Sequence, residues 1–225
     1  MGQIKGIIFD MDGTMVDNMM IHHRMWQRKL AELGLEMTIE EVKENIHGVN
    51  TEILERLFGN RFTPEERIRI SAEKEAAYRE FFKPRLKLVD GLPDLLEDLY
   101  RAGIPMAIGT AAPPENVDFV LDTLQIRHYF RTILHSDDVK NGKPDPEIYL
   151  KAASGLGLTP SDCLVFEDSV TGAETAKNAG CPAIIVTTTH EKEEFGHFSH
   201  IQKFIPNFIG TGIENLRGIN TTLNQ

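Results

Sequence analysis

The chain has 225 residues, 41% of them hydrophobic and 26% charged, so it is long enough for one core domain with a smaller appended one and too ordinary in composition for a disordered protein. Its 24 basic and 34 acidic residues give a net charge of −10, which argues against a nucleic-acid-binding face and against binding to an anionic membrane. We therefore expect neither nucleic acid nor a membrane as a partner.

Targeting and disulfide signals are weak in this sequence. No stretch approaches the roughly 18 apolar residues of a spanning helix, and residues 1–12 show neither the long apolar run nor the cleavage site of a signal peptide. The two cysteines, Cys163 and Cys181, are too few for a disulfide scaffold and adjoin apolar segments, so we expect buried thiols. A monomer in the cytoplasm is the expectation.

The first predicted element is a buried strand. Residues 4–9 are short, apolar and rich in β-branched side chains, and they lead directly into Asp10-Met11-Asp12-Gly13-Thr14. This order of residues predicts a strand followed by a polar turn.

Residues 17–84 then contain several helical patterns and no convincing strand. Thr38-x-x-Glu41 and Thr63-Pro64-x-Glu66 are typical of capping boxes at helix starts. We therefore expect an all-helical cap domain at residues 17–84, inserted into a core domain made of residues 1–16 and 85–225. Two chain crossings between the domains favour a hinge, and the cleft between two domains is a natural ligand site.

In the remainder of the chain, short apolar runs alternate with helical patterns. Strands are predicted at residues 105–108, 132–135, 163–166 and 183–186, and helices at residues 92–101, 115–124, 147–156 and 170–179. Alternation of this kind implies a parallel sheet with helices on both faces. The expected fold class is α/β, with a Rossmann-like parallel sheet in the core domain and the helical cap inserted into it.

Carboxylates gather where the predicted strands end, which is the edge of an open α/β sheet where ligands bind. Any one of these residues suits an ordinary turn. Together their like charges repel unless a cation or a proton compensates, and oxygen ligands without Cys or His favour Mg²⁺ over zinc. The strand-end residues are Asp10, Asp12, Gly13, Thr14, Thr110, Asp137, Asp138, Glu167 and Asp168.

Four motifs in this order carry a resemblance that covers nearly the whole chain. They are Asp10-Met11-Asp12-Gly13-Thr14, Ile108-Gly109-Thr110, Gly142-Lys143-Pro144-Asp145-Pro146 and Val165-Phe166-Glu167-Asp168-Ser169-x-x-Gly172. The chain resembles the haloacid dehalogenase superfamily of phosphotransferases, within it the β-phosphoglucomutase-like group with a helical cap.

The resemblance implies a covalent mechanism. Asp10 would attack phosphorus and form an aspartyl-phosphate, which splits one difficult transfer into two easier ones. Asp12 would act as the general acid and base, protonating the leaving oxygen and then activating water. Thr110 and Lys143 would hold the phosphoryl oxygens, and Lys143 could also pair with Asp10.

The resemblance also implies a Mg²⁺ site and a substrate site. The ion would be held by the Asp10 side chain, the Asp12 backbone carbonyl and Asp168, with Glu167 nearby or bound through water. Trp26, by contrast, is expected to pack within the cap. The residues expected to bind the substrate are Gly13, Thr14, His22, His47 and Ala111.

Two departures from the mutases bear on the reaction. His47 and Thr51 stand where the sugar-phosphate mutases carry a basic pair around the Gly-Val of the cap, and Ala111-Ala112-Pro113-Pro114 stands where they carry small polar residues and a Lys. Each lost charge-assisted contact is worth about 1.5–3 kcal/mol, so a second phosphate would be held weakly.

We therefore expect a Mg²⁺-dependent phosphatase that hydrolyses a small phosphorylated metabolite, such as a sugar phosphate. The first alternative is a hexose-phosphate mutase of the β-phosphoglucomutase type. The second is a non-catalytic protein that binds a phosphorylated ligand on the same scaffold.

Histidines late in the sequence predict nothing catalytic. His190, His197 and His200 lie among Lys192 and Glu193-Glu194, a pattern that indicates an exposed loop rather than a metal site. The short run Gly210-Thr211-Gly212 indicates a turn and not a nucleotide-binding loop.

Overall fold

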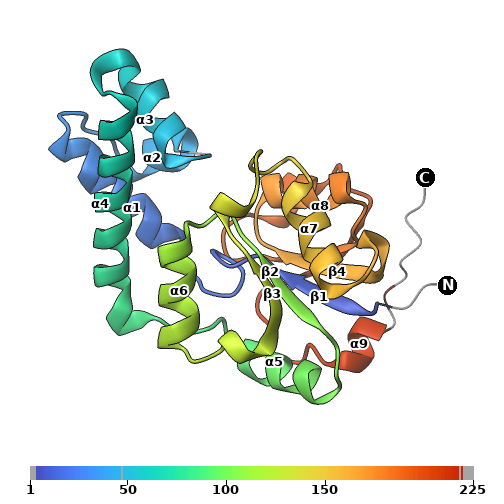
Figure 1. Cartoon of the computed structure of the whole chain (residues 1–225). Coiled ribbons are helices and arrows are strands. Elements are labelled where there is room, and N and C mark those ends of the chain that lie inside the picture. Colours follow the sequence, from blue (N-terminus) through green and yellow to red (C-terminus); the bar gives the residue numbers. More distant parts are fainter. Residues whose placement is uncertain (1–3, 47, 218, 220–225) are drawn as a thin grey trace. The chain divides into compact units, whose positions relative to one another are not determined.

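A computed structural model describes residues 4–46, 48–217 and 219 of the chain (Figure 1). The chain divides into two compact units. One comprises Met1–Asp17 and Lys87–Gln225, and we call it the sheet unit; the other comprises Asn18–Leu86, and we call it the helical unit.

The sheet unit is a parallel α/β structure. In chain order its elements are β1 (Gly6–Phe9), α5 (Leu92–Arg101), β2 (Met106–Gly109), α6 (Pro114–Thr123), β3 (Phe130–Leu134), α7 (Glu147–Leu156), β4 (Cys163–Glu167), α8 (Val170–Ala179), β5 (Ala183–Val186), β6 (Ile201–Ile205) and α9 (Ile213–Arg217). Within the described residues the sheet has six strands in the order β3-β2-β1-β4-β5-β6, and every paired neighbour is parallel. The helices α1–α4 are inserted after β1, so the predicted fold class is confirmed.

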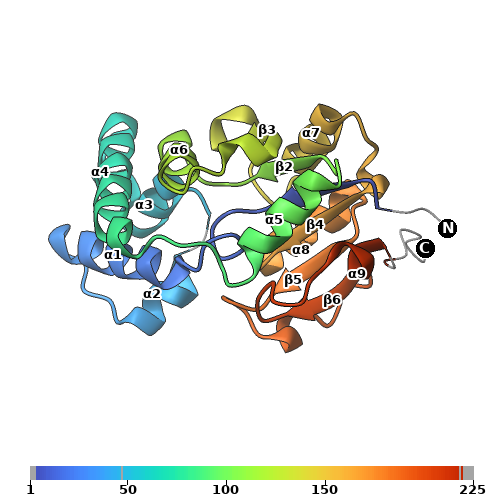
Figure 2. The same ribbon diagram turned by 90° about the horizontal axis from the view of Figure 1, so that it is seen from below.

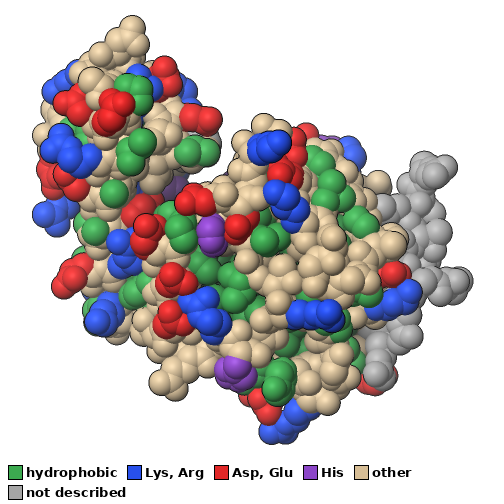
Figure 3. Space-filling model, in the orientation of Figure 1, with side chains coloured by type: hydrophobic (Ala, Val, Ile, Leu, Met, Phe, Trp, Pro, Cys, Tyr) green, Lys and Arg blue, Asp and Glu red, His purple; other side chains and the backbone are tan. Residues whose placement is uncertain are grey.

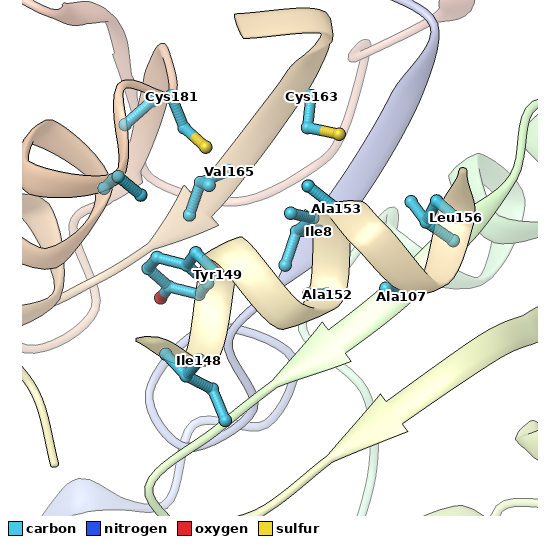
Figure 4. Close-up of a cluster of buried hydrophobic side chains, with 13 residues drawn as sticks. Ile8, Ala107, Ile148, Tyr149, Ala152, Ala153, Leu156, Cys163, Val165 and Cys181 are labelled. Carbon is cyan, nitrogen blue, oxygen red and sulfur yellow. The ribbon is translucent and has the colours of Figure 1, made fainter. Parts of the chain in front are cut away.

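Helices cover both faces of the sheet. In the two views of Figures 1 and 2, α7 and α8 lie together on one face, while α5 and α9 lie together on the other. Figure 4 shows the side chains that α7 turns toward β1, β2 and β4, among them Tyr149, Ala152 and Ala153. Cys163 and Cys181 are buried in the same cluster as free thiols, as expected.

The sixth strand corrects the sequence-based prediction. We expected His190, His197 and His200 to lie in an exposed loop; His197 is exposed, but His200 is only 2% exposed and leads directly into β6. The strand was missed because it lies at the edge of the sheet, where Gln202 and Lys203 face solvent and interrupt the apolar pattern.

The register between β1 and β4 positions the candidate site. Phe9 lies opposite Phe166, and their rings stack with centroids 5.1 Å apart. The ladder continues one residue further, because the backbone N–H of Asp10 donates to the Phe166 carbonyl over 2.9 Å. Asp10 and Glu167 therefore leave adjacent strands at the same edge of the sheet.

The helical unit consists of four α-helices among the described residues: α1 (Met19–Glu32), α2 (Ile39–Asn45), α3 (Asn50–Phe58) and α4 (Pro64–Phe82). The capping boxes predicted at Thr38 and Thr63 are both present, with Glu41 and Glu66 closing them. The unit has its own apolar cluster, which includes Trp26, so this residue packs in the core as expected.

The chain leaves and re-enters the sheet unit at two neighbouring points. Met15 lies just before the helical unit and Val89 just after it, and the Val89 N–H donates to the Met15 carbonyl over 2.9 Å. The second connection is fixed further by the Phe208 N–H, which donates to the Asp90 carbonyl over 2.9 Å. Both connections are thus part of the sheet unit.

Surface charge and helix composition bear on the predicted partners. Lys and Arg side chains are interspersed with Asp and Glu over the face that Figure 3 shows. In the part of the chain that the structure describes, no helix is long and apolar enough to cross a membrane.

Candidate active site

Asp10 lies at the centre of the candidate site, directly after β1. Its side chain is buried, with a residue exposure of 6%, and its Oδ1 accepts a hydrogen bond from Lys143 Nζ over 2.8 Å. Burial and the nearby charges of Glu167 and Asp168 raise the pKa of Asp10 well above its ordinary value, although Lys143 opposes this rise. The carboxyl is thus held where a further cation would favour its ionised form.

Lys143 joins several groups of the site. It precedes α7, and its ammonium donates to Glu167 Oε1 over 2.5 Å and to the Tyr149 hydroxyl over 2.8 Å, in addition to Asp10. Burial disfavours the charged form, but the carboxylates of Asp10 and Glu167 dominate and raise the Lys143 pKa above its ordinary value. Its side chain is 9% exposed, which excludes a solvated loop lysine.

Glu167, the last residue of β4, is saturated with hydrogen bonds. Its Oε1 accepts from Lys143 and from the Tyr149 hydroxyl, and its Oε2 accepts from the Asp168 N–H and from both the N–H and the hydroxyl of Ser169. Burial opposes ionisation, yet these donors, with Lys143 first among them, hold the pKa of Glu167 below its ordinary value. Glu167 is therefore an ionised, fixed carboxylate.

Asp168 is the third buried carboxylate. Burial and the charge of Glu167 raise its pKa to about 8, although the nearby hydroxyl groups of Thr189 and Thr14 and the charge of Lys143 oppose the rise. Thr14 is itself fully buried, and its hydroxyl donates to Asp168 Oδ1 over 3.2 Å. The site thus keeps a carboxyl that only a compensating charge would fully ionise near neutral pH.

These three carboxylates form a group that fits a divalent cation. Asp10, Glu167 and Asp168 each offer an oxygen, and these oxygens lie within 4.8 Å of one another. Oxygen-only donors are what Mg²⁺ prefers, and two of the three carboxyls are held away from full ionisation by burial and mutual repulsion. The donor set therefore matches the ion that the sequence predicts.

Two glycines allow the carboxylates to pack this closely. A Cβ on Gly13 would lie 2.0 Å from Asp168 Oδ2, and Gly13 also has a φ of +79°, which glycine adopts most readily. A Cβ on Gly172 would lie 1.8 Å from the carboxylate carbon of Glu167. Both motif glycines are therefore required by close approach to an acidic side chain.

Thr110 and Ala111 follow β2 at the same edge of the sheet. Thr110 is buried, its N–H donates to the Leu134 carbonyl over 3.1 Å, and its hydroxyl oxygen accepts from the Ala112 N–H over 3.1 Å. Ala111 is exposed. Asp12, in the turn after β1, is half-buried, and its backbone forms an isolated β-bridge with that of Val16.

The predicted substrate-binding histidines lie in the helical unit or outside the described residues. His22 stacks on Tyr78 with ring centroids 3.9 Å apart, and its Nδ1 is 3.3 Å from Lys74 Nζ. Burial and the Lys74 charge lower the His22 pKa to about 3. His47 lies outside the described residues.

Two residues at the site were missed from the sequence. Tyr149 bridges Lys143 and Glu167 through its hydroxyl, and Thr188 donates from its hydroxyl to the Gly13 carbonyl. Tyr149 sits among the apolar residues of α7, so the helical pattern marks it only as core. Thr188 follows a strand without an acidic or glycine motif.

Comparison with known proteins finds a matching family model and similar curated proteins. Residues 4–180 match the family model described as haloacid dehalogenase-like hydrolase. The chain is 31% identical to the fructose-1-phosphate phosphatase YqaB of Escherichia coli, over 80% of this chain and 95% of that protein.

Solved structures are similar over almost the whole chain. The crystal structure of a HAD hydrolase of family IA, variant 3, from Entamoeba histolytica superposes with a TM-score of 0.86 at 28% identity, covering 94% of this chain and 97% of that one. The β-phosphoglucomutase of Clostridium difficile superposes with a TM-score of 0.81 at 25% identity, covering 95% of each chain.

Proposed function

Because this chain belongs to the haloacid dehalogenase-like hydrolases, we propose that it is a Mg²⁺-dependent phosphatase that hydrolyses a small phosphorylated metabolite, in particular a sugar phosphate. The observation that carries the proposal is the position of Asp10. It lies buried at the end of β1, bound to Lys143 and grouped with two further carboxylates at the edge of the sheet where ligands bind.

In the proposed reaction, a carboxylate oxygen of Asp10 attacks the phosphorus of the ester. The bond between phosphorus and the ester oxygen breaks, and Asp12 gives its proton to that leaving oxygen. Water then attacks the aspartyl-phosphate while Asp12 takes a proton from it. Inorganic phosphate leaves, and Asp10 is again a carboxylate.

Charge on the transferring phosphoryl group has to be neutralised in this acidic cluster. We assign Lys143 and Thr110 to its oxygens, with Gly13, Thr14 and Ala111 lining the space around it. When bound, Mg²⁺ would supply further neutralisation of the phosphoryl oxygens. We assign the Asp10 side chain, the Asp12 backbone carbonyl and Asp168 as the residues that hold the ion.

Glu167 has a different proposed role from Asp10 and Asp168. Its two oxygens already accept the hydrogen bonds of Lys143, Tyr149, Asp168 and Ser169. We therefore assign it to fixing Lys143 and the backbone of Asp168, and place it outside the direct ligands of the ion. This is the role that outer carboxylates have at many metal sites.

We assign choice of the substrate to the helical unit as a separate cap domain, with His22 and residue 47 as its candidate contacts. The His22 ring would act there as a neutral hydrogen-bonding group, because its pKa is lowered to about 3. Thr51 replaces one cation that the mutases use for a second phosphate, which favours a substrate with a single phosphate.

The test is a release assay with Mg²⁺ over a panel of sugar phosphates and other phosphorylated metabolites. Wild type should release inorganic phosphate from at least one compound, and Asp10→Asn should release none, because an amide cannot attack phosphorus as a carboxylate does. Release by Asp10→Asn at the wild-type rate would exclude an aspartyl-phosphate. No turnover of any compound would instead favour the non-catalytic alternative.

A mutase is the second candidate, favoured by the similarity to the Clostridium difficile β-phosphoglucomutase. It would convert β-glucose 1-phosphate to glucose 6-phosphate, with stimulation by a bisphosphate primer. A coupled assay that detects glucose 6-phosphate separates the two reactions. Inorganic phosphate alone would exclude the mutase.

A further inference from the structure

The segment after β5 reaches across to the turn that carries the candidate nucleophile. This segment, Thr187–Thr189, belongs to the sheet unit, as does the turn Asp10–Thr14. The Thr188 hydroxyl donates to the Gly13 carbonyl, although 175 positions separate the two residues in the sequence. This side-chain hydrogen bond therefore links the two segments.

Thr188 is anchored through the residue before it, which bonds to the neighbouring strand β6. The N–H of the preceding residue, Thr187, donates to the Ile205 carbonyl of β6 over 2.9 Å, and the Thr187 hydroxyl donates to the same carbonyl over 3.4 Å. Thr187 therefore donates its hydrogen bonds to β6, whereas the Thr188 hydroxyl donates to the turn that carries Asp10. The hydrogen bonds of Thr187 to β6 thus fix the backbone from which the Thr188 side chain extends.

The Gly13 carbonyl belongs to the peptide that joins Gly13 to Thr14. Thr14 in turn donates its hydroxyl to Asp168 Oδ1 over 3.2 Å. On its other side, the Gly13 N–H donates to the Val16 carbonyl over 2.8 Å. Thr188 thus fixes a peptide that lies between the candidate acid and base, Asp12, and the candidate metal ligand Asp168.

The space around this peptide is tightly filled. A Cβ on Gly13 would lie 2.0 Å from Asp168 Oδ2 and 2.8 Å from Thr189 Oγ1. The turn at Gly13 therefore leaves no room for a side chain and packs directly against both groups. Small displacement of the turn would therefore move Asp12 and Thr14 relative to Asp168.

We propose that Thr188 is a positioning residue, whose hydroxyl fixes the Gly13–Thr14 peptide. The fixed peptide keeps Asp12 in place for proton transfer, and it keeps the hydrogen-bonded pair of Thr14 and Asp168 in place for binding the metal ion. The assignment rests on the proposed function and adds to the site a residue from the segment after β5. Thr188 contacts the turn and not the reacting atoms.

The test compares Thr188→Val, which removes the hydroxyl and keeps the branched shape, with Thr188→Ser, which keeps a hydroxyl. With p-nitrophenyl phosphate and saturating Mg²⁺, Thr188→Val should lower kcat about 10- to 100-fold with little change in KM, because misplacement of reacting groups costs rate rather than uniform binding. Thr188→Ser should restore kcat to within about threefold of wild type.

Thr187→Val is the matched control. It removes a hydroxyl from the neighbouring residue of the same segment, but that hydroxyl bonds to Ile205 and not to the nucleophile turn, and the shorter bond from the Thr187 N–H to the same carbonyl still anchors the segment. It should therefore keep the wild-type kcat. Thermal unfolding of all three variants establishes that each is folded at the assay temperature.

A second measurement requires no turnover. Calorimetric titration with Mg²⁺ alone should show several-fold weaker binding to Thr188→Val than to wild type or Thr187→Val. If wild type hydrolyses nothing, the proposed function fails, and this titration still decides the positioning role. Unchanged kcat and unchanged Mg²⁺ affinity in folded Thr188→Val, or equal losses in Thr187→Val, would overturn the inference.

Discussion

Lys143 and Asp10, separated by 133 positions in the sequence, are joined by a 2.8 Å ion pair inside the sheet unit. The same ammonium lies 2.5 Å from Glu167 Oε1. One cation thus serves two carboxylates, and these come from the ends of the neighbouring strands β1 and β4. Lys143 therefore links the two strand ends and also neutralises part of the negative charge there.

Replacement of Lys143 by Met is expected to destabilise the protein and to abolish most activity. It leaves the ionised carboxylate of Glu167 buried without its cation, which costs about 3–5 kcal/mol when a buried pair is broken. Urea unfolding of the metal-free protein measures this change, and phosphate release measures the loss of rate. The control is Lys151→Met, which removes an exposed lysine from α7, the helix that follows Lys143 in the chain.

Lys151→Met should leave both the unfolding free energy and the rate nearly unchanged, because exposed ion pairs contribute little. If Lys143→Met unfolds at the same urea concentration as wild type, the ion pairs of Lys143 do not stabilise the sheet unit.

Stabilisation by Mg²⁺ is expected to increase with pH. The Asp168 pKa rises from its ordinary 3.8 to about 8 in the metal-free protein, so between these values the unfolded chain loses its proton first. The stability of the metal-free protein therefore falls as pH rises through this window. Because Mg²⁺ binds the ionised carboxylate, the increase in Tm that it causes should be larger at pH 8 than at pH 5.

Melting curves with and without Mg²⁺ at the two pH values measure this difference. Asp168→Asn should show a small Tm increase with Mg²⁺ at both. An equal Tm increase for wild type at pH 5 and pH 8 contradicts the assignment of Asp168 to the metal site.

The helical unit contains a buried ion pair whose partners are expected to be strongly coupled. Lys74 and Glu75 are 2% and 7% exposed, their charged atoms are 2.5 Å apart, and Asn50 donates to the same Glu75 oxygen over 2.7 Å. Glu75→Leu should lower the unfolding free energy by about 3–5 kcal/mol, because it leaves a buried ammonium without its carboxylate.

The double variant Lys74→Met with Glu75→Leu should be more stable than either single variant, since it removes both charges together. Unfolding free energies of the four proteins complete the cycle. Strictly additive losses would show that the two residues act independently.

His200 is expected to make the protein sensitive to acid. Burial, with the nearby charge of Lys177, lowers the His200 pKa from 6.5 to about 4. As pH falls from about 6.5 to about 4, the unfolded chain gains the proton first, so stability falls through this window. His200→Phe should lose less stability than wild type over that range.

The measurement is the unfolding free energy at pH 7 and at pH 4.5 for wild type, His200→Phe and the exposed control His197→Phe. The His197 variant should follow wild type. A His200→Phe protein as acid-sensitive as wild type would show that other groups govern the acid response.

The sequence alone predicted the fold class and the grouping of Asp10 with Asp168, for a physical reason. Apolar strands that alternate with helices form parallel sheets, and parallel strands bring their carboxyl ends to one edge. Adjacency of β1 and β4 then follows from the family resemblance, and the observed register places Phe9 opposite Phe166. Residues that directly follow strands were therefore predictable.

Two kinds of site residue were not predictable: those within a helix, and those in a loop that carries no sequence motif. Tyr149 lies on the apolar face of α7, where periodicity indicates only packing, and its hydroxyl happens to meet Lys143. Thr188 follows an apolar strand without any motif. Strand β6 was missed because it lies at the edge of the sheet, where the consecutive residues Gln202 and Lys203 face solvent and interrupt the apolar pattern that identifies buried strands.

The hydrogen bond from Val89 to Met15 closes the sheet unit around the point where the helical insertion leaves it. A tight turn between these two positions could replace the whole insertion without rerouting the backbone of β1 or α5. The insertion is therefore a modular part, exchangeable in evolution or in the laboratory for one of different length. The sheet unit and the insertion can consequently diverge on separate sections of the gene.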